Sequence, residues 1–215
     1  MIYLGLDLGQ RQDPSALAIV ERVMPVTRSL NYVTWQVSQQ IEPAPMVVRY
    51  LERMPLGTEY TEVVKRVAAV VAQPELQGKK TLAVDATGVG MPVVEMLLRE
   101  RMGCEVRPVV FTAGMGQSTD GRLWFVGKVD LMSGLRQALA TGEMQIPKQV
   151  ADGVQLVKEL MSVTVGMRPS GQARVGADGF GEHDDLVIAL ALACWAGLGA
   201  KPWKPAREPA QRLFW

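Results

Sequence analysis

Short apolar runs separated by polar loops fill the first forty residues and predict strands. Ile2–Leu8 is a continuous apolar run that ends at Gly9, which is typical of a buried strand. Ser15–Val23 forms a second run, and Asn31–Ile41 is rich in Val, Thr, Tyr and Trp, which favour strands. Because the connections between these three runs are short, we expect them to form an antiparallel meander.

From residue 58 onward, helical and strand-like patterns alternate. Valines recur at helical spacing within Thr58–Gln73. The strand-like runs Thr81–Asp85 and Val106–Phe111 flank a helix predicted over Met91–Arg101, which has Pro92 in its first turn, where proline is tolerated. This order predicts a mixed α/β sheet that contains parallel strand pairs.

The last part of the folded region has a different composition. Gly114–Gly121 is rich in Gly, Ser and Thr and is predicted to be flexible. Helices are expected over Lys128–Thr141 and Val150–Met161, followed by a hairpin over Ser162–Val175 that turns at Pro169-Ser170-Gly171.

A final helix is expected from about Asp184 to Trp195. It is apolar around its whole circumference, so it must be buried. We therefore predict one domain over residues 1–198, followed by a tail, 199–215, whose Pro, Lys and Arg content favours an extended or disordered segment.

Composition and charge change this picture little. The formal net charge is +1, so nucleic-acid binding would require positive charge gathered locally. The two cysteines show no metal-binding spacing, which favours a reduced, cytoplasmic protein. The chain begins directly with a strand-like run, and its longest apolar run, Leu186–Ala200, is short for a bilayer, so we expect no membrane role.

Acidic residues occur at three places where burial is expected. Asp7 lies in an apolar strand, on the same face as Tyr3 and Gly5, and Asp85 ends another strand. Asp184 and Asp185 begin the buried final helix. Buried carboxylates are costly unless they are paired, hydrogen-bonded or bound to a metal ion. These positions are therefore candidates for chemistry.

Each position also has a structural interpretation. Asp184 or Asp185 can serve as an N-cap, which is the simpler explanation for either one alone. Asp85 can cap the turn into the following helix, and Asp13, before Pro14, is explained as a turn residue. A central strand offers Asp7 no capping role, so its carboxylate is the hardest to explain structurally.

The acidic positions carry more weight together. Ligands of α/β sheets gather at the carboxyl ends of strands, and the start of a buried helix can lie beside those ends. Three or four carboxylates there would repel one another unless divalent cations were bound. Oxygen ligands without cysteine favour Mg²⁺ or Mn²⁺, and two such ions support phosphodiester hydrolysis. The single histidine, His183, is either a group that orients water or phosphate, or a solvent-facing residue.

Four segments, in this order, resemble the nuclease domain of the tailed-phage terminase large subunit. They cover the chain from Ile2 to Trp195, and no single one is specific without the others. They are LGLDLGQRQDPSALAIVE, LAVDATGVGMPVVEMLL, VGKVDLMSGLRQALATGEMQIP and GADGFGEHDDLVIALALACW.

The resemblance implies a ribonuclease-H-like fold: a mixed β-sheet, with three antiparallel strands followed by parallel strands, flanked by helices on both faces. It implies that Asp7, Asp85 and Asp184 are the catalytic, metal-binding triad, with two Mg²⁺ or Mn²⁺ ions. The auxiliary and DNA-binding residues that it implies are Asp185 as a further metal ligand, Asp13 and His183 beside the site, and Lys128 and Arg122 on DNA.

The implied activity is metal-dependent endonuclease cleavage of concatemeric double-stranded viral DNA during genome packaging. The implied partners are an ATPase packaging motor, a small terminase subunit or a portal, in the cytoplasm of an infected bacterial host. The chain departs from the family in two ways. Ile188 stands where many relatives have another acidic residue, which leaves open whether Asp184 or Asp185 is the main ligand. It also lacks the GxxxxGK[ST] phosphate loop, so it is either a nuclease-only subunit or the nuclease part of a longer chain.

Three other functions are compatible with the same residues. An actin-like sugar kinase or ATPase also uses Asp-Leu-Gly and glycine loops, but it needs two such domains. A Holliday-junction resolvase would use similar carboxylates on branched DNA. A non-catalytic assembly subunit would use the basic and aromatic tail, which ends in Leu213, Phe214 and Trp215, to bind a partner.

Overall fold

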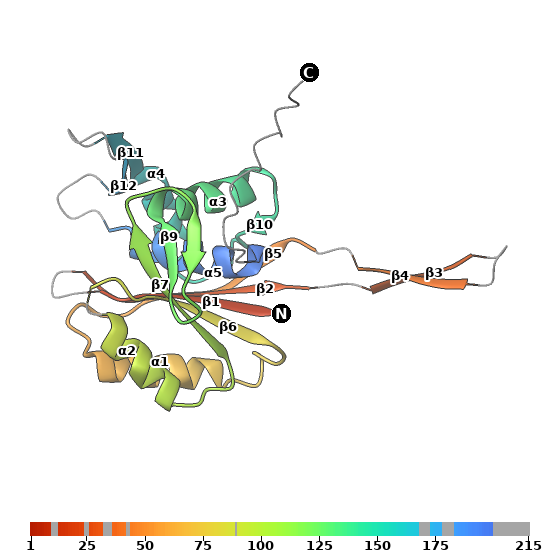
Figure 1. The fold of residues 1–215 in the computed structure, drawn as a ribbon, viewed down its shortest axis with the longest axis horizontal. Coiled ribbons are helices and arrows are strands. Elements are labelled where there is room, and N and C mark those ends of the chain that lie inside the picture. Colours follow the sequence, from red (N-terminus) through yellow and green to blue (C-terminus); the bar gives the residue numbers. More distant parts are fainter. Residues whose placement is uncertain are drawn as a thin grey trace, which may run out of the picture.

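Eight of the strands form one mixed sheet that is covered by helices on both faces. A computed structural model of the chain describes residues 1–9, 13–23, 26–31, 36–41, 44–88, 90–167, 173–177 and 183–199. The strand order in the sheet is β10-β5-β2-β1-β6-β7-β9-β8. In Figure 1, α1 and α2 lie on one side of the sheet, and α3, α4 and α5 lie on the other.

The antiparallel half of the sheet consists of β1 (Ile2–Asp7), β2 (Ala16–Arg22) and β5 (Met46–Arg53). β1 pairs with β2, and β2 pairs with β5, both in antiparallel orientation. The first five residues of β1 and of β2 are buried, which explains their continuous apolar runs.

The third antiparallel strand is not the one that the sequence predicted. Val26–Asn31 (β3) and Gln36–Ile41 (β4) pair only with each other in a separate two-stranded sheet, which extends away from the domain (Figure 1). The third position is occupied by β5, which the sequence analysis missed. The strand-favouring residues of 31–41 indicate a strand, but they carry no information about its partner.

The parallel half continues from β1 through β6 (Lys80–Asp85), β7 (Glu105–Thr112) and β9 (Trp124–Gly127). The helix α2 (Gly90–Arg99) connects β6 to β7, as the alternating pattern predicted. It packs beside α1 (Tyr60–Val71), whose valines at helical spacing are all buried. These two helices cover the face of the sheet formed by the even-numbered residues of β1.

Two short strands complete the edges of the sheet. β8 (Gln117–Thr119) pairs antiparallel with β9, so part of the segment predicted to be flexible, Gly114–Gly121, is a strand. This prediction was wrong because polar residues at a sheet edge show no hydrophobic pattern. At the other edge, β10 (Met144–Gln145) pairs in parallel with β5.

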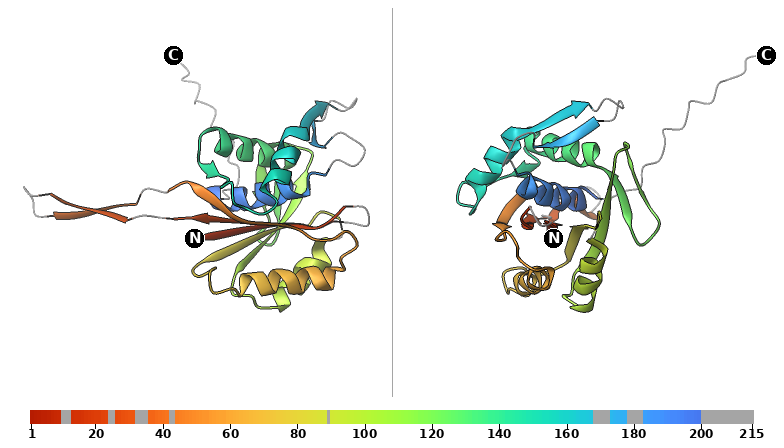
Figure 2. Two further views of the ribbon diagram at one scale, coloured as in Figure 1. Left: turned by 180° about the vertical axis from the view of Figure 1, so that it is seen from behind. Right: turned by 90° about the vertical axis from the view of Figure 1, so that its left-hand side faces the viewer.

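The second face of the sheet holds α3 (Lys128–Ala140), α4 (Gly153–Ser162) and α5 (Asp185–Leu198). The right-hand view of Figure 2 shows α5 directly on the sheet, with α3 and α4 beyond it. The predicted hairpin is present as β11 (Val163–Met167) and β12 (Ala173–Ala177). Its expected turn at 169–171, and the tail from residue 200, lie outside the described residues.

The helix α5 is buried on all sides, as its uniformly apolar sequence predicted. Its close approach to β1 depends on Gly5, because a Cβ atom there would overlap the backbone carbonyl of Ala189. At the other end of the helix, the ring of Trp195 meets that of Trp124 edge-on, with a centroid distance of 5.3 Å. The described helices include none with the length and apolarity needed to cross a membrane.

Candidate active site

Asp7 and Asp85 lie side by side where two parallel strands end. Asp7 is the last residue of β1 and Asp85 the last of β6, and the register pairs Leu6 with Val84 directly before them. The Asp85 carboxylate accepts a hydrogen bond from the backbone N–H of Thr87 at 2.8 Å. Asp85 therefore does cap the turn after β6, as its structural interpretation predicted, and it also faces Asp7.

The first turn of α5 brings a second pair of carboxylates to the same edge. Asp184 occupies the N-cap position, since its carbonyl accepts the N–H of Ile188 at 2.8 Å. Its side chain, however, caps no backbone N–H of the described residues. One carboxylate oxygen instead lies 3.3 Å from Nζ of Lys128, at the start of α3. The N-cap interpretation of Asp184 thus holds for its backbone but not for its carboxylate.

Asp185 is almost completely buried, with 4% of the residue exposed. Its Oδ2 lies 3.6 Å from Nε of Arg53 and 3.7 Å from Nδ1 of His183. Neither Oδ2 nor the Arg53 Nε has a hydrogen-bond partner among the described residues. A buried carboxylate oxygen without a donor is costly, which marks this atom as a place for a cation.

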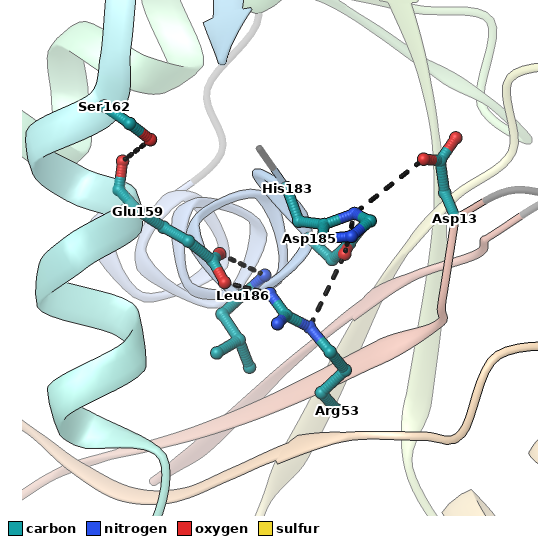
Figure 3. Close-up of polar contacts among 7 residues, drawn as sticks. All are labelled: Asp13, Arg53, Glu159, Ser162, His183, Asp185 and Leu186. Atoms are coloured by element: carbon teal, nitrogen blue, oxygen red, sulfur yellow. Dashed lines mark hydrogen bonds and ion pairs between the residues drawn. The ribbon is translucent and has the colours of Figure 1, made fainter. Parts of the chain in front are cut away.

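Arg53 and Glu159 also belong to the site, although neither was predicted from the sequence. Arg53 ends β5, and its Nη2 donates to Oε1 of Glu159, which lies on α4 and is 3% exposed. The other oxygen of Glu159 accepts the backbone N–H of Leu186 at 3.1 Å (Figure 3). The available signal was a glutamate three residues after Leu156, on the buried face of a helix.

The carboxylates act on one another through a poorly solvated environment. Burial, followed by repulsion from Asp85, Asp185 and Asp184 in that order, raises the pKa of Asp7 well above its ordinary value. Burial likewise raises the pKa of Asp85 and of Glu159. It also raises the pKa of Asp185 to about 7, although Arg53 acts in the opposite direction. Burial and mutual repulsion therefore disfavour the ionisation of all these carboxylates together when no cation is bound.

The remaining predicted residues lie at different distances from this cluster. His183 Nδ1 lies 4.0 Å from a carboxylate oxygen of Asp13, in addition to its approach to Asp185, so His183 stands between the two aspartates (Figure 3). Lys128 contacts the cluster through Asp184. Arg122 lies in the turn between β8 and β9, where its guanidinium is 3.7 Å from Glu95 of α2.

No protein-family model and no curated protein matches the chain. Solved structures do match it. The large terminase nuclease of the thermophilic phage G20c is 23% identical, with a TM-score of 0.59 over 91% of this chain and 81% of that chain. The large terminase nuclease domain of Thermus phage P74-26 is 21% identical, with a TM-score of 0.55 over 95% and 83%. The chain has the terminase nuclease fold. The human cytomegalovirus terminase nuclease domain shares it at 12% identity, with a TM-score of 0.52 over 91% and 82%.

The terminase nuclease fold confirms the predicted ribonuclease-H-like architecture of antiparallel strands followed by parallel ones. Other structures of the G20c nuclease contain bound magnesium and bound cobalt, and each is 24% identical to this chain with a TM-score of 0.59. The human cytomegalovirus domain was soaked with manganese. Divalent metal ions therefore bind to other proteins of this fold.

The carboxylates of the site supply only oxygen ligands, which are the ligands that hard divalent cations prefer. The Oδ2 of Asp185, which has no hydrogen-bond partner among the described residues, is an independent observation in the same direction. In their present rotamers, however, no three His, Cys, Asp or Glu side chains of the described residues are arranged to hold a metal ion. In this arrangement Asp184 contacts Lys128, and Asp85 accepts a hydrogen bond from the backbone of Thr87.

Proposed function

We propose that the chain is a metal-dependent endonuclease that cleaves double-stranded DNA by phosphodiester hydrolysis. The observation that carries this proposal is the convergence of Asp7, Asp85 and the first turn of α5 on one edge of the sheet, where a buried oxygen of Asp185 has no hydrogen-bond partner among the described residues. The terminase nuclease fold supports it. A kinase or ATPase role would leave the acidic start of α5 without a use.

The proposed metal ligands are Asp7, Asp85, Asp184 and Asp185. Asp185 is the stronger candidate of the last two, because it is more deeply buried and raises the pKa of Asp7 more than Asp184 does. Two bound Mg²⁺ or Mn²⁺ ions would supply acidity to an attacking water and positive charge to the leaving oxygen. Binding such ions would require Asp184 and Asp85 to turn from their present contacts with Lys128 and Thr87.

Lys128 has a proposed role that follows from its present partner. Its ammonium lies 3.3 Å from the Asp184 carboxylate, and it lowers the pKa of Asp85 and Asp7. When Asp184 turns to a cation, the ammonium loses this partner and becomes available to a DNA phosphate. His183 would hold Asp13 and Asp185 in place or orient the attacking water. Arg122, which is exposed at a turn, would contact the DNA backbone farther from the cleaved bond.

The proposed substrate is concatemeric viral DNA that is cut during genome packaging in the cytoplasm of an infected bacterium. Contacts with phosphates would dominate binding, so sequence preference would be weak. Because residues 1–215 contain no GxxxxGK[ST] loop, the ATPase motor would be supplied by another part of a longer chain or by a separate subunit, acting with a small terminase subunit or a portal.

A plasmid nicking and linearisation assay tests the proposal. Wild-type protein is incubated with Mg²⁺, Mn²⁺ or EDTA and compared with the Asp7→Asn, Asp85→Asn and Asp184→Asn variants. The matched control is Asp152→Asn, because Asp152 is an exposed aspartate at the start of α4, on another part of the domain. We expect metal-dependent cleavage that the control retains and that the Asp7 and Asp85 variants lose. Full activity in either of those two would refute the site assignment.

The substrate is tested by supplying linear duplex and a four-way junction in the same reaction. Preferred cleavage of the duplex supports a packaging nuclease, whereas selective cutting at the branch point would assign the chain to the resolvases. Binding of Mn²⁺, measured separately by calorimetry, shows whether a folded but inactive preparation has lost the metal site or only the ability to cut.

A further inference from the structure

Glu159 performs a task that an aspartate at the start of α5 would ordinarily perform. The first N–H groups of a helix have no partner within the helix and are commonly capped by the N-cap side chain. Here the N–H of Leu186 is capped instead by Glu159 of α4, at 3.1 Å. Because this cap comes from another helix, neither Asp184 nor Asp185 has to turn its carboxylate toward the backbone.

Glu159 also determines where the Arg53 guanidinium points. Arg53 donates through Nη2 to Glu159, and its Nε lies 3.6 Å from the Oδ2 of Asp185 without a hydrogen bond between them (Figure 3). A guanidinium pairs strongly with a carboxylate when both of its donors face it. Glu159 takes up Nη2, one of the two donors that such a pair with Asp185 would need.

We propose that Glu159 is a positioning residue: by holding both the Arg53 guanidinium and the N–H of Leu186 in the first turn of α5, it keeps the Asp185 carboxylate available to a metal ion. This inference rests on the proposed function, because it concerns a ligand of the same site. Glu159 would touch neither the ion nor the DNA, and it would act only through Asp185.

A second arginine–glutamate pair at the opposite end of α5 provides a matched control. Arg22 of β2 donates to Glu143 at 2.6 Å and to the carbonyl of Gly197, near the C-terminal end of α5, at 3.1 Å. Each pair joins an arginine to a glutamate, and each contacts the backbone of α5. Only the pair with Glu159 lies beside the carboxylates, so a loss of Mn²⁺ affinity confined to the Glu159 variants would point to the site and not to the anchoring of α5.

The test measures Mn²⁺ binding by calorimetry on the full chain, together with the Mn²⁺ concentration that gives half-maximal cleavage. Glu159→Gln keeps an oxygen for Leu186 but removes the charge that holds Arg53. We expect its affinity for Mn²⁺ to fall by about 10- to 100-fold, the usual range for residues that orient a metal ligand. Saturating Mn²⁺ should restore most of the cleavage rate, whereas Glu143→Gln should bind Mn²⁺ as wild type does.

A double variant distinguishes the pairing of Glu159 with Arg53 from its capping of the Leu186 N–H. In Glu159→Gln with Arg53→Gln, no guanidinium competes for Asp185, so the affinity for Mn²⁺ should return to within about threefold of wild type. If Glu159→Gln does not fold, Glu159→Asp replaces it with the same expected loss, because its shorter side chain cannot reach both partners.

The outcomes separate this inference from the proposed function. Wild-type affinity in the Glu159 variants, or an equal loss in Glu143→Gln, overturns the positioning role and leaves the nuclease proposal standing. A wild-type protein that neither binds Mn²⁺ nor cleaves DNA overturns both proposals. A variant that binds Mn²⁺ weakly and is not rescued by the double substitution assigns Glu159 to capping alone, which also overturns the inference.

Discussion

Replacing Asp185 with asparagine should change how the stability of the metal-free protein depends on pH. Burial raises the pKa of this carboxyl from an ordinary 3.8 to about 7, and the neighbouring carboxylates Glu159 and Asp184 act in the same direction. In the folded protein, Asp185 therefore keeps its proton at pH values at which the unfolded chain has lost it. Asparagine has nearly the same shape and no proton to lose.

The sign and the size of the effect follow from proton linkage. A raised pKa contributes stability that is complete below the unfolded value and is lost as the pH rises through the folded value. The shift of Asp185 from 3.8 to about 7 corresponds to about 4 kcal/mol, at 1.36 kcal/mol for each pH unit. As the pH rises from about 4 to about 8, the unfolding free energy of wild type should fall by up to about 4 kcal/mol more than that of Asp185→Asn.

Urea unfolding followed by circular dichroism, in EDTA and at several pH values, measures this difference. The exposed control Asp152→Asn should follow the wild-type curve. Asparagine at 185 also relieves the repulsion that raises the pKa of Asp7, which adds to the difference in the same direction. The reasoning would be refuted if the unfolding free energies of wild type and Asp185→Asn changed in parallel with pH. It would also be refuted if wild type became more stable relative to the variant as the pH rose.

Three further predictions use other parts of the structure. Gly5→Ala should lower the unfolding free energy by about 3 kcal/mol, because the added methyl group overlaps the carbonyl of Ala189. The control Gly114→Ala, which adds a methyl group in open space, should leave the unfolding free energy unchanged. Urea titration measures both variants. Lys128→Met should weaken DNA binding and reduce the slope of log affinity against log salt concentration by about one. Fluorescence anisotropy with Mn²⁺ measures this slope, and an unchanged slope would exclude a phosphate contact. Mn²⁺ at about 100 times its Kd should stabilise wild type by about 2.7 kcal/mol and should hardly stabilise Asp7→Asn. Thermal unfolding measures the effect, and equal increases of Tm in the two proteins would place the metal elsewhere.

Most of the secondary structure could be predicted from local pattern, and the errors have a common cause. Strands that are buried on both faces, such as β1 and β6, and a helix as uniformly apolar as α5, carry a strong periodic signal. The strand β5 was missed, and the segment containing β8 was predicted to be flexible. Both lie toward the edges of the sheet, where burial is partial and pairing depends on a neighbour distant in the sequence.

Part of the candidate site could be predicted in the same way. Asp7, Asp85, Asp184 and Asp185 are conspicuous because carboxylates are rare in apolar segments, and the topology of a parallel sheet brings them to one edge. Glu159 was not conspicuous, because it lies on an amphipathic helix, where a glutamate is ordinarily exposed.

The sequence by itself determined the buried elements, their order and the carboxylates at their ends, because each of these follows from the burial that a local run of residues demands. Tertiary structure alone decided how those carboxylates are held. It paired Lys128 with Asp184, placed His183 between Asp13 and Asp185, and brought Glu159 to the first turn of α5. These contacts join residues that are mostly far apart along the chain. Their energy depends on distance and solvation in the folded protein, which no local pattern encodes.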